Sequence, residues 1–261
     1  MTYTTILYSI DGGVATITLN RAASLNAFND AMIHETTEAF RQTERDSSVR
    51  VVVLTGAGRG FSSGQDLAEF RNHSTAVTVS GHLRGGYHKL VKQMMRLEKP
   101  IIGAINGVAA GAGLGVALAC DVRIAAERAV FMLAFSRIGL IPDTGLNWIL
   151  PRLIGYQRAY AMAINADKVP AQTALTWGMV NEVVPDAALS DTAQHWAQRL
   201  AAGPTLAFGL TKRAMIKGFE QDFDQALDYE AHVQEIAAKT HDNIEGIAAF
   251  LEKRTAKFTG A

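Results

Sequence analysis

The chain has 261 residues, 48% of them hydrophobic, and its 25 basic and 25 acidic side chains give a formal net charge of +0. This hydrophobic content suffices for a buried core, and the lack of a basic run argues against nucleic acid or an anionic membrane as a partner. The single cysteine, Cys120, excludes an internal disulfide framework. No signal region and no membrane-length apolar run is visible, so we expect a cytoplasmic protein without a membrane span.

Short β-prone runs, several of them ending in glycine-rich turns, predict strands in the first part of the chain. In chain order these runs are 6–10, 14–19, 49–54, 101–105 and 122–125. Asp11-Gly12-Gly13 joins the first two as a hairpin signal, and a helical pattern with Asn29 or Asp30 as N-cap follows. The repeated order of strand, strand and helix predicts a mixed α/β core.

Gly203 and Pro204 mark the main break in the chain. The segment after them shows helical patterns with apolar faces at three- and four-residue spacing and no strand signal. We therefore predict two regions, a mixed core over 1–203 and a helical region over 204–261. The helical region is expected to pack on the core or on a neighbouring subunit.

A first turn of small residues, Ser62 to Leu67, indicates chemistry at a backbone amide. It follows a strand and exposes the amide of Gln65 before a helix, and helix N-termini attract developing negative charge. Taken alone, the segment is also explained by a tight strand-to-helix connection in which Asp66 serves only the helix start.

A second turn, Asn106 to Gly115, alternates glycine with alanine and is a poor helix former. Either a ligand or another helix must therefore approach its backbone closely. A dinucleotide-binding turn is disfavoured because the run lacks the Gly-x-Gly-x-x-Gly order, and no Gly-Lys-Ser/Thr follows for a nucleotide P-loop. Backbone donors with no side chain in the way suit an oxyanion.

Asp143 lies just before a predicted helix start, where the simplest role is that of an N-cap. The alternative is a carboxylate at the mouth of an apolar pocket, where burial would raise its pKa and make it a usable proton shuttle. The expected walls of that pocket are Phe131, Phe135, Leu140 and Trp148.

Other chemistry-bearing side chains give no motif. The seven histidines show no metal-ligand spacing, and no metal site is predicted. His82 and His88 are six residues apart, which assigns them to different faces of a helix. Cys120 lies in an apolar run and is interpreted as a core residue rather than a nucleophile.

Several segments together resemble the enoyl-CoA hydratase/isomerase (crotonase) superfamily along the whole chain. They are Leu19-Asn20-Arg21, Leu25-Asn26-Ala27-Phe28, Leu54 to Phe61, Gly64-Gln65-Asp66-Leu67, Pro100 to Asp121 and Trp177-Gly178-Met179-Val180. The resemblance implies a crotonase-like α/β spiral of ββα repeats with C-terminal helices that form a homotrimer, often paired into a hexamer. It also implies an acyl-CoA substrate whose carbonyl lies between the amides of Gln65 and Ala112.

The same resemblance implies that coenzyme A enters as part of the substrate, with no permanently bound cofactor. Acyl-group contacts are expected from Ser63, Gly64, Asp66, Leu67, Gly111, Phe135, Leu140 and Trp148. Coenzyme A contacts are expected from Arg21, Ala27 and Lys257.

Departures from the family pattern reduce the number of family reactions that this chain is expected to catalyse. The two glutamates that activate water in hydratases correspond to Gly115 and Phe135 here, so simple hydration is disfavoured. Asp143 stands where hydratases usually have glycine. The stretch from Ala134 to Asp143 looks most like the ring-epoxide isomerases of phenylacetate breakdown, whose aspartate assists conversion of 1,2-epoxyphenylacetyl-CoA to the oxepin thioester and can move a double bond from C3 to C2.

The 4-chlorobenzoyl-CoA dehalogenases are a close rival, because their aspartate nucleophile corresponds to Asp143. Their supporting histidine would fall at Lys92 and their tryptophan at Phe135, so attack on an aromatic chloride loses its support. We predict an isomerase that uses Asp143, Gln65 and Ala112. Outside the enzymes, the alternative is a family member that binds acyl-CoA thioesters without turning them over, whereas RNA binding finds no support in a neutral chain.

Overall fold

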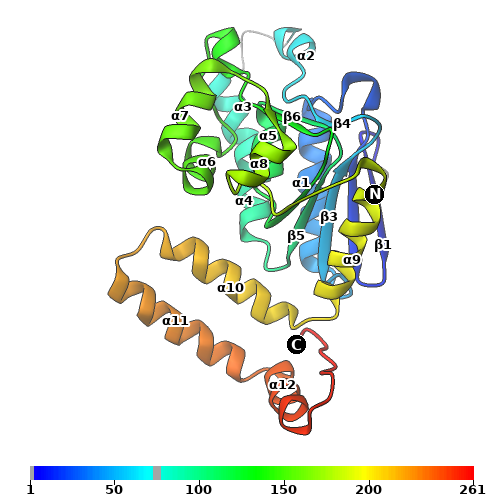
Figure 1. Cartoon of the computed structure of the whole chain (residues 1–261), viewed down its shortest axis with the longest axis vertical. Coiled ribbons are helices and arrows are strands. Elements are labelled where there is room, and N and C mark those ends of the chain that lie inside the picture. Colours follow the sequence, from blue (N-terminus) through cyan, green and yellow to red (C-terminus); the bar gives the residue numbers. More distant parts are fainter. Residues whose placement is uncertain (1–2, 73–77) are drawn as a thin grey trace.

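The computed structural model describes residues 3–72 and 78–261 (Figure 1). Its core holds two sheets, a larger one with strand order β1-β2-β3-β5-β7-β10 and a smaller one with order β4-β6-β8-β9. All pairs are parallel except β1 with β2 and β8 with β9. The strands are β1 (Ile6–Asp11), β2 (Val14–Leu19), β3 (Val51–Gly56), β4 (Gly60–Ser62), β5 (Ile101–Ile105), β6 (Val108–Ala110), β7 (Val122–Ala126), β8 (Val130–Met132), β9 (Val169–Pro170) and β10 (Glu182–Val184).

From β3 to β8, consecutive strands alternate between the two sheets. In each of the pairs β3/β4, β5/β6 and β7/β8, the first strand joins the larger sheet and the second joins the smaller one. Helices follow the pairs, which confirms the predicted α/β spiral of ββα units. The strands of the smaller sheet are only two or three residues long and were not predicted, because so short a run has no measurable periodicity.

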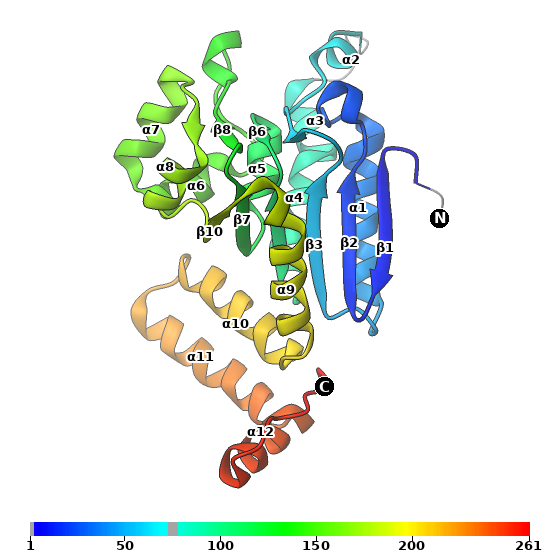
Figure 2. The ribbon, with the colours of Figure 1, turned by 45° about the vertical axis from the view of Figure 1, so that its right-hand side comes forward.

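Twelve α-helices lie within the described residues, and the turned view separates those that cover the sheet from those that leave it (Figure 2). They are α1 (Asp30–Arg45), α2 (Leu67–Asn72), α3 (Val79–Gly85), α4 (Tyr87–Arg96), α5 (Ala112–Leu118), α6 (Leu146–Ile154), α7 (Tyr156–Asn165), α8 (Ala171–Thr176), α9 (Leu189–Ala201), α10 (Thr205–Gly218), α11 (Phe223–Ala238) and α12 (His241–Glu252). The side chain of Asn29 accepts a hydrogen bond from the amide of Met32, which confirms Asn29 as the N-cap of α1.

The larger sheet separates two apolar clusters. One lies beneath α1, α4 and α5, and the other lies between the sheet and α9. Strand β5 is buried along its whole length, as expected for a parallel strand covered on both faces. Cys120 belongs to the first cluster beside Gly103, and burial raises the pKa of its thiol to about 12.

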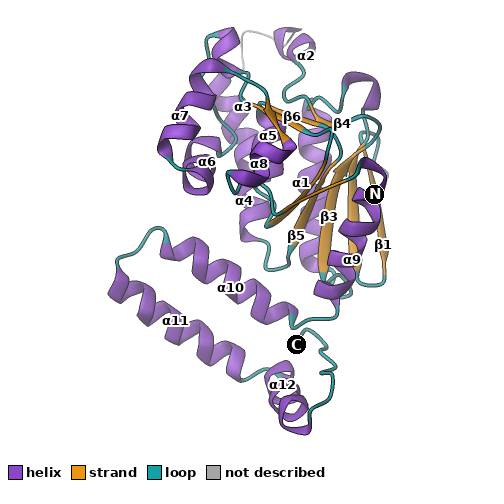
Figure 3. Ribbon diagram, in the orientation of Figure 1, coloured by secondary structure: helices purple, strands orange, loops and turns teal. Residues whose placement is uncertain are grey.

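The chain after Pro204 is helical, as predicted, and α10, α11 and α12 extend away from the sheets in both views (Figures 1 and 2). Coloured by secondary structure, this arm contains no strand among the described residues (Figure 3). An ion pair of 3.0 Å between Lys212 of α10 and the partly buried Asp121 ties the arm to the core. Over 3–72 and 78–261, no helix is both long and apolar enough to cross a bilayer.

Candidate active site

The turn that carries Gln65 is fixed by backbone pairing with Phe28. The Phe28 amide donates to the carbonyl of Gly64 (2.7 Å), and the Asp66 amide donates to the carbonyl of Phe28 (2.8 Å). Neighbouring amides in an extended segment point in opposite directions, so the Gln65 amide faces away from Phe28. It makes no hydrogen bond with any described residue, and Gln65 lines a cavity of about 270 Å³.

Ala112 presents a second free amide to the same cavity. It is the first residue of α5, and the N–H groups of a first helical turn have no partner within the helix. The preceding Gly111 has φ +51°, a left-handed conformation that glycine adopts without strain. A Cβ atom at Gly64 would lie 3.4 Å from the nitrogen of Ala112, so the two turns lie side by side.

Close approach of other chain segments explains two glycines of the second turn. A Cβ at Gly113 would lie 2.6 Å from the Cβ of Ser62, and a Cβ at Gly115 would lie 2.7 Å from the carbonyl oxygen of Thr144. The expected contact with this backbone is therefore made by the protein itself at both positions. Gly115, where the resemblance places the first hydratase glutamate, has no room for a side chain in this arrangement.

Asp143 lines the same cavity as the two turns and lies on the segment that leads into α6. Its carboxylate accepts a hydrogen bond from the Thr144 hydroxyl (2.7 Å), while α6 has Gly145 as N-cap and no side-chain cap. The N-cap interpretation of Asp143 is therefore wrong. Burial raises the pKa of this carboxyl, opposed by the Thr144 hydrogen bond and by the nearby His88 and His82.

Three residues of the site were missed by sequence reasoning: His82, Tyr87 and His88. The hydroxyl of Tyr87 donates to the Gln65 side-chain oxygen at 2.6 Å, and His82 Nε2 lies 3.1 Å from that oxygen. The histidines do not lie on two faces of one helix, because the chain breaks at Gly86 between α3 and α4. The Gly85-Gly86 pair was the signal that could have shown this break.

The remaining cavity walls are mostly those predicted. The cavity is lined by Ser63, Gly64, Leu67, Gly111, Phe135 and Leu140, and by additional apolar residues that include Val79, Leu83 and Ile138. Two expected walls are absent. Phe131 is fully buried in β8, and Trp148 lies against Phe219 (ring centroids 5.6 Å apart) in a separate groove, so the prediction that they line this cavity is wrong.

The Gln65 turn is held by polar contacts among Arg21, Ala27 and Asp66. The Arg21 guanidinium donates to the Ala27 carbonyl (2.6 Å) and pairs with Asp66 (3.0 Å). Asp66 also accepts from the Glu69 amide, and this hydrogen bond followed by the Arg21 contact holds its pKa below the usual range. Asp66 thus serves the start of α2 rather than the lining of the cavity.

Lys257 lies in the segment that follows α12, and α12 is at the opposite end of the molecule from α2 (Figures 1 and 2). Its amide donates to Glu245, within the helical arm. The three residues expected to contact coenzyme A therefore do not come together within one chain.

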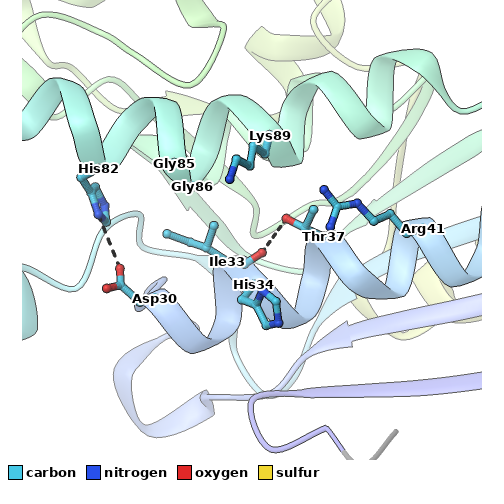
Figure 4. Close-up of a pocket in the computed structure, with 9 residues that line it drawn as sticks. All are labelled: Asp30, Ile33, His34, Thr37, Arg41, His82, Gly85, Gly86 and Lys89. Carbon is cyan, nitrogen blue, oxygen red and sulfur yellow. Dashed lines mark hydrogen bonds and ion pairs between the residues drawn. The ribbon is translucent and has the colours of Figure 1, made fainter.

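A second cavity of about 400 Å³ lies between α1 and the α3–α4 break and shares His82 with the first (Figure 4). Its walls are Asp30, Ile33, His34, Thr37, Arg41, His82, Gly85, Gly86 and Lys89. His82 forms the partition between the cavities, with Nδ1 3.5 Å from Asp30 in one and Nε2 toward Gln65 in the other. Neither free amide nor Asp143 reaches the larger cavity, so the candidate chemistry belongs to the smaller one.

Comparisons with known proteins identify the family of the chain. The family model described as enoyl-CoA hydratase/isomerase matches residues 9–261. The chain is 45% identical over 257 residues to the 1,2-epoxyphenylacetyl-CoA isomerase of Escherichia coli (strain K12), with 98% of each chain covered. It is 36% identical over 245 residues to 4-chlorobenzoyl coenzyme A dehalogenase-1 of an Arthrobacter species, covering 92% of this chain and 88% of the relative.

Solved structures show the same fold. The crystal structure of enoyl-CoA hydratase from Bacillus anthracis matches with a TM-score of 0.91 and 34% identity, covering 99% of this chain and 100% of that chain. The protein belongs to the enoyl-CoA hydratase/isomerase family, and the crotonase-type spiral expected from its sequence is confirmed. Among the described residues, no three His, Cys, Asp or Glu side chains are grouped to hold a metal ion.

Proposed function

We propose that the protein is an acyl-CoA isomerase in which Asp143 moves a proton and the amides of Gln65 and Ala112 hold the thioester oxygen. The observation that supports this most directly is the content of the small cavity. Its walls include two residues with free amides and one half-buried carboxylate, and Asp143 is the sole carboxyl group among its described lining residues. One carboxylate suffices to shuttle a proton, whereas activating water in the hydratase manner takes two.

The reaction follows from the charges. Asp143 takes a proton from C2 of a 3-enoyl thioester, and the electron pair of that bond delocalises onto the thioester oxygen. Two preorganised amides stabilise this oxygen, and one such donor is worth about 10²–10³ in rate. The same carboxyl then returns the proton to C4, which leaves the conjugated 2-enoyl thioester. A raised pKa suits this exchange because it makes the carboxylate a stronger base.

For the natural acyl group we propose the ring epoxide 1,2-epoxyphenylacetyl-CoA, converted to its oxepin isomer. The similarity to the isomerase of Escherichia coli supports this choice, as do the apolar side chains of Phe135, Ile138 and Leu140 around Asp143, which suit a hydrocarbon ring. Coenzyme A then enters with each substrate and leaves with each product, without a resident cofactor.

The residues of the same cavity also bear on two other reactions of the family, hydration and dehalogenation. Hydration is disfavoured because Gly115 packs against Thr144 and Phe135 is apolar, so neither position supplies a second acid. Dehalogenation is a serious alternative, because His88 lies near enough to Asp143 to lower its pKa. This proximity weakens the argument that rested on Lys92, whereas Phe135 still argues against an aromatic chloride as substrate.

The test compares the wild-type protein with Asp143→Asn. With a 3-enoyl-CoA as substrate, the variant should lose about 10³-fold in turnover while it retains acyl-CoA affinity, because general acid–base catalysis contributes about 10²–10⁴. Absorbance of the conjugated thioester measures turnover, and calorimetry measures binding. Asp11→Asn, at an exposed strand end, is the matched control and should keep full activity.

Wild-type turnover in Asp143→Asn would contradict the proposed proton transfer by Asp143. Release of chloride from 4-chlorobenzoyl-CoA by the wild-type protein, without isomerase activity, would identify a dehalogenase instead. Binding of acyl-CoA without conversion of enoyl, epoxide or chlorobenzoyl thioesters would identify a non-catalytic binder.

We further propose that the protein works as a trimer or hexamer in the cytoplasm. Support comes from apolar side chains of the helical arm that one chain leaves exposed by 46–83%: Phe223, Leu227, Ile247, Phe250 and Leu251. An exposed apolar surface of this kind marks an interaction site. Sedimentation equilibrium should give three or six copies, and a monomer at micromolar concentration would contradict the proposal. Cell fractionation tests the location.

A further inference from the structure

The side chain of Gln65 is held as firmly as its backbone. Its Oε1 atom accepts a hydrogen bond from the Tyr87 hydroxyl at 2.6 Å, and His82 Nε2 lies 3.1 Å away. An amide oxygen can only accept, so the Tyr87 hydrogen is directed to Gln65. Because Tyr87 is only 1% exposed, water cannot replace this partner at little cost.

Packing fixes Tyr87 in turn. Its ring meets Phe28 edge-on, with centroids 6.0 Å apart, and meets His82 in the same way at 5.7 Å. Phe28 is the residue that pairs with the backbone on both sides of Gln65. Main chain and side chain of Gln65 are therefore tied to one small cluster, which leaves its amide as the free group that faces the cavity.

We propose that Tyr87 is a positioning residue of the oxyanion hole. Its hydroxyl fixes the Gln65 side chain and thereby the peptide whose N–H receives the thioester oxygen. An oxyanion hole works because its donors are oriented before the reaction, and small misplacements of such groups are costly. This inference rests on the proposed role of the Gln65 amide, but not on the identity of the acyl group or on Asp143.

Tyr87 is not offered as an acid or base. Burial, with the negative charge of Asp143 next in importance, raises the pKa of its hydroxyl well above the usual range. Its hydrogen is also engaged with Gln65. A purely structural role would alter stability alone, whereas a positioning role alters the rate of the chemical step more than substrate affinity.

The experiment uses Tyr87→Phe, Gln65→Met and the double variant, with two readouts. The first is kcat and KM with a 3-enoyl-CoA. The second uses acetoacetyl-CoA, whose enolate has its own ultraviolet absorbance, so that bound enolate reports the oxyanion hole without turnover. Tyr8→Phe is the matched control, since it removes a tyrosine hydroxyl that contacts Thr43 far from the cavity.

Each single variant should lose about tenfold in kcat and a comparable share of bound enolate, with KM changed less than about twofold, as expected for one lost hydrogen bond. The double variant should lose no more than the worse single variant, because both changes break the same contact. Tyr8→Phe should match the wild-type protein. Circular dichroism checks folding, and Gln65→Met keeps Tyr87 in place should Tyr87→Phe fail to fold.

Unchanged kcat and enolate absorbance in Tyr87→Phe would overturn the proposal, as would a change confined to KM or losses that multiply in the double variant. If the wild-type protein isomerises no thioester but binds the enolate in a Tyr87-dependent way, the proposed function fails and the role of Tyr87 stands. If the wild-type protein isomerises thioesters but Tyr87→Phe changes neither readout, the proposed function stands and the positioning role of Tyr87 fails.

Discussion

Polar side chains hold the turn that carries Gln65, whereas glycine contacts hold the turn that carries Ala112. In the first, Tyr87 and Arg21 donate hydrogen bonds to Gln65 and Asp66 from two separate segments. In the second, Gly113 and Gly115 have no side chains, so the backbone of α5 packs directly against Ser62 and Thr144 of the same chain. A hydrogen-bonded turn can be loosened one contact at a time, while a close-packed turn tolerates no added atom. Two identical donors therefore respond differently to mutation.

The largest effect is expected at Gly113. A methyl group there would lie 2.6 Å from both Cβ and Oγ of Ser62, and 2.8 Å from its carbonyl oxygen. Gly113→Ala should cost about 2–3 kcal/mol of stability, since overpacking typically costs 1–3, and should abolish most turnover. Denaturant unfolding and kcat measure the two effects.

Gly218, in the exposed last turn of α10, has open space around a Cβ position and supplies the control. Gly218→Ala should leave activity intact and raise stability by up to about 1 kcal/mol through helix propensity. Equal behaviour of the two variants would refute the contrast between packed and open glycines.

An intermediate effect is expected at Gly115. A methyl group there would meet the oxygen, Cβ and Cγ2 of Thr144 at 2.7–2.8 Å. Gly115→Ala should cost about 1–3 kcal/mol by overpacking and should lower kcat, because Thr144 adjoins Asp143. Thr144 itself has φ +51°, a strained conformation for a β-branched residue.

Thr144→Gly in the same chain should therefore recover about half of the lost stability, because it removes two of the three clashing atoms and relaxes the backbone. The double-variant cycle checks this coupling. Strictly additive free energies of unfolding would show that the two residues do not meet as described.

The smallest effect concerns pH and separates Asp143 from the turn that carries Ala112. Burial raises the pKa of Asp143 in the folded chain, so between the unfolded and the folded pKa the native state binds more protons. The Asp143 contribution to stability should fall as pH rises through that window, and Asp143→Asn should remove this slope. Turnover should rise with pH through the raised pKa, because the ionised form is the base.

The pH profiles of stability and of turnover, recorded for the wild-type protein and for Asp143→Asn, measure these slopes. The glycine-packed turn from Gly111 to Gly115 has no ionisable side chain, so it adds nothing to either profile. If the difference in stability between the wild-type protein and Asp143→Asn rose with pH instead, Asp143 would be stabilised in its ionised form.

The sequence was informative where chemistry depends on local conformation. The free amide of Gln65 could be predicted from its turn, and the helical arm from its three- and four-residue spacing. Ala112 was singled out only through the family resemblance, which identified one amide within the glycine-rich turn. Tyr87 and His82 could not be predicted, since they reach Gln65 across 22 and 17 residues and belong to no motif. Their placement depends on the break at Gly86, where one expected helix becomes two.

Trp148 shows a different limit. Thr144 and Gly145 both adopt left-handed conformations, so α6 begins only at Leu146. These two residues turn the chain before the helix starts, and the face of Trp148 cannot be counted from Asp143. The indole consequently lies against Phe219 and Arg152, outside the acyl cavity.

The buried Cys120 gives the chain a practical property. With its pKa raised to about 12, its thiol has almost no reactive thiolate at neutral pH, and it is the sole cysteine. A cysteine introduced at Ile141, which is 77% exposed two residues from Asp143, would then be the one group that a maleimide dye modifies. No native cysteine therefore has to be replaced before a fluorescent reporter is attached at position 141, next to Leu140 of the cavity wall.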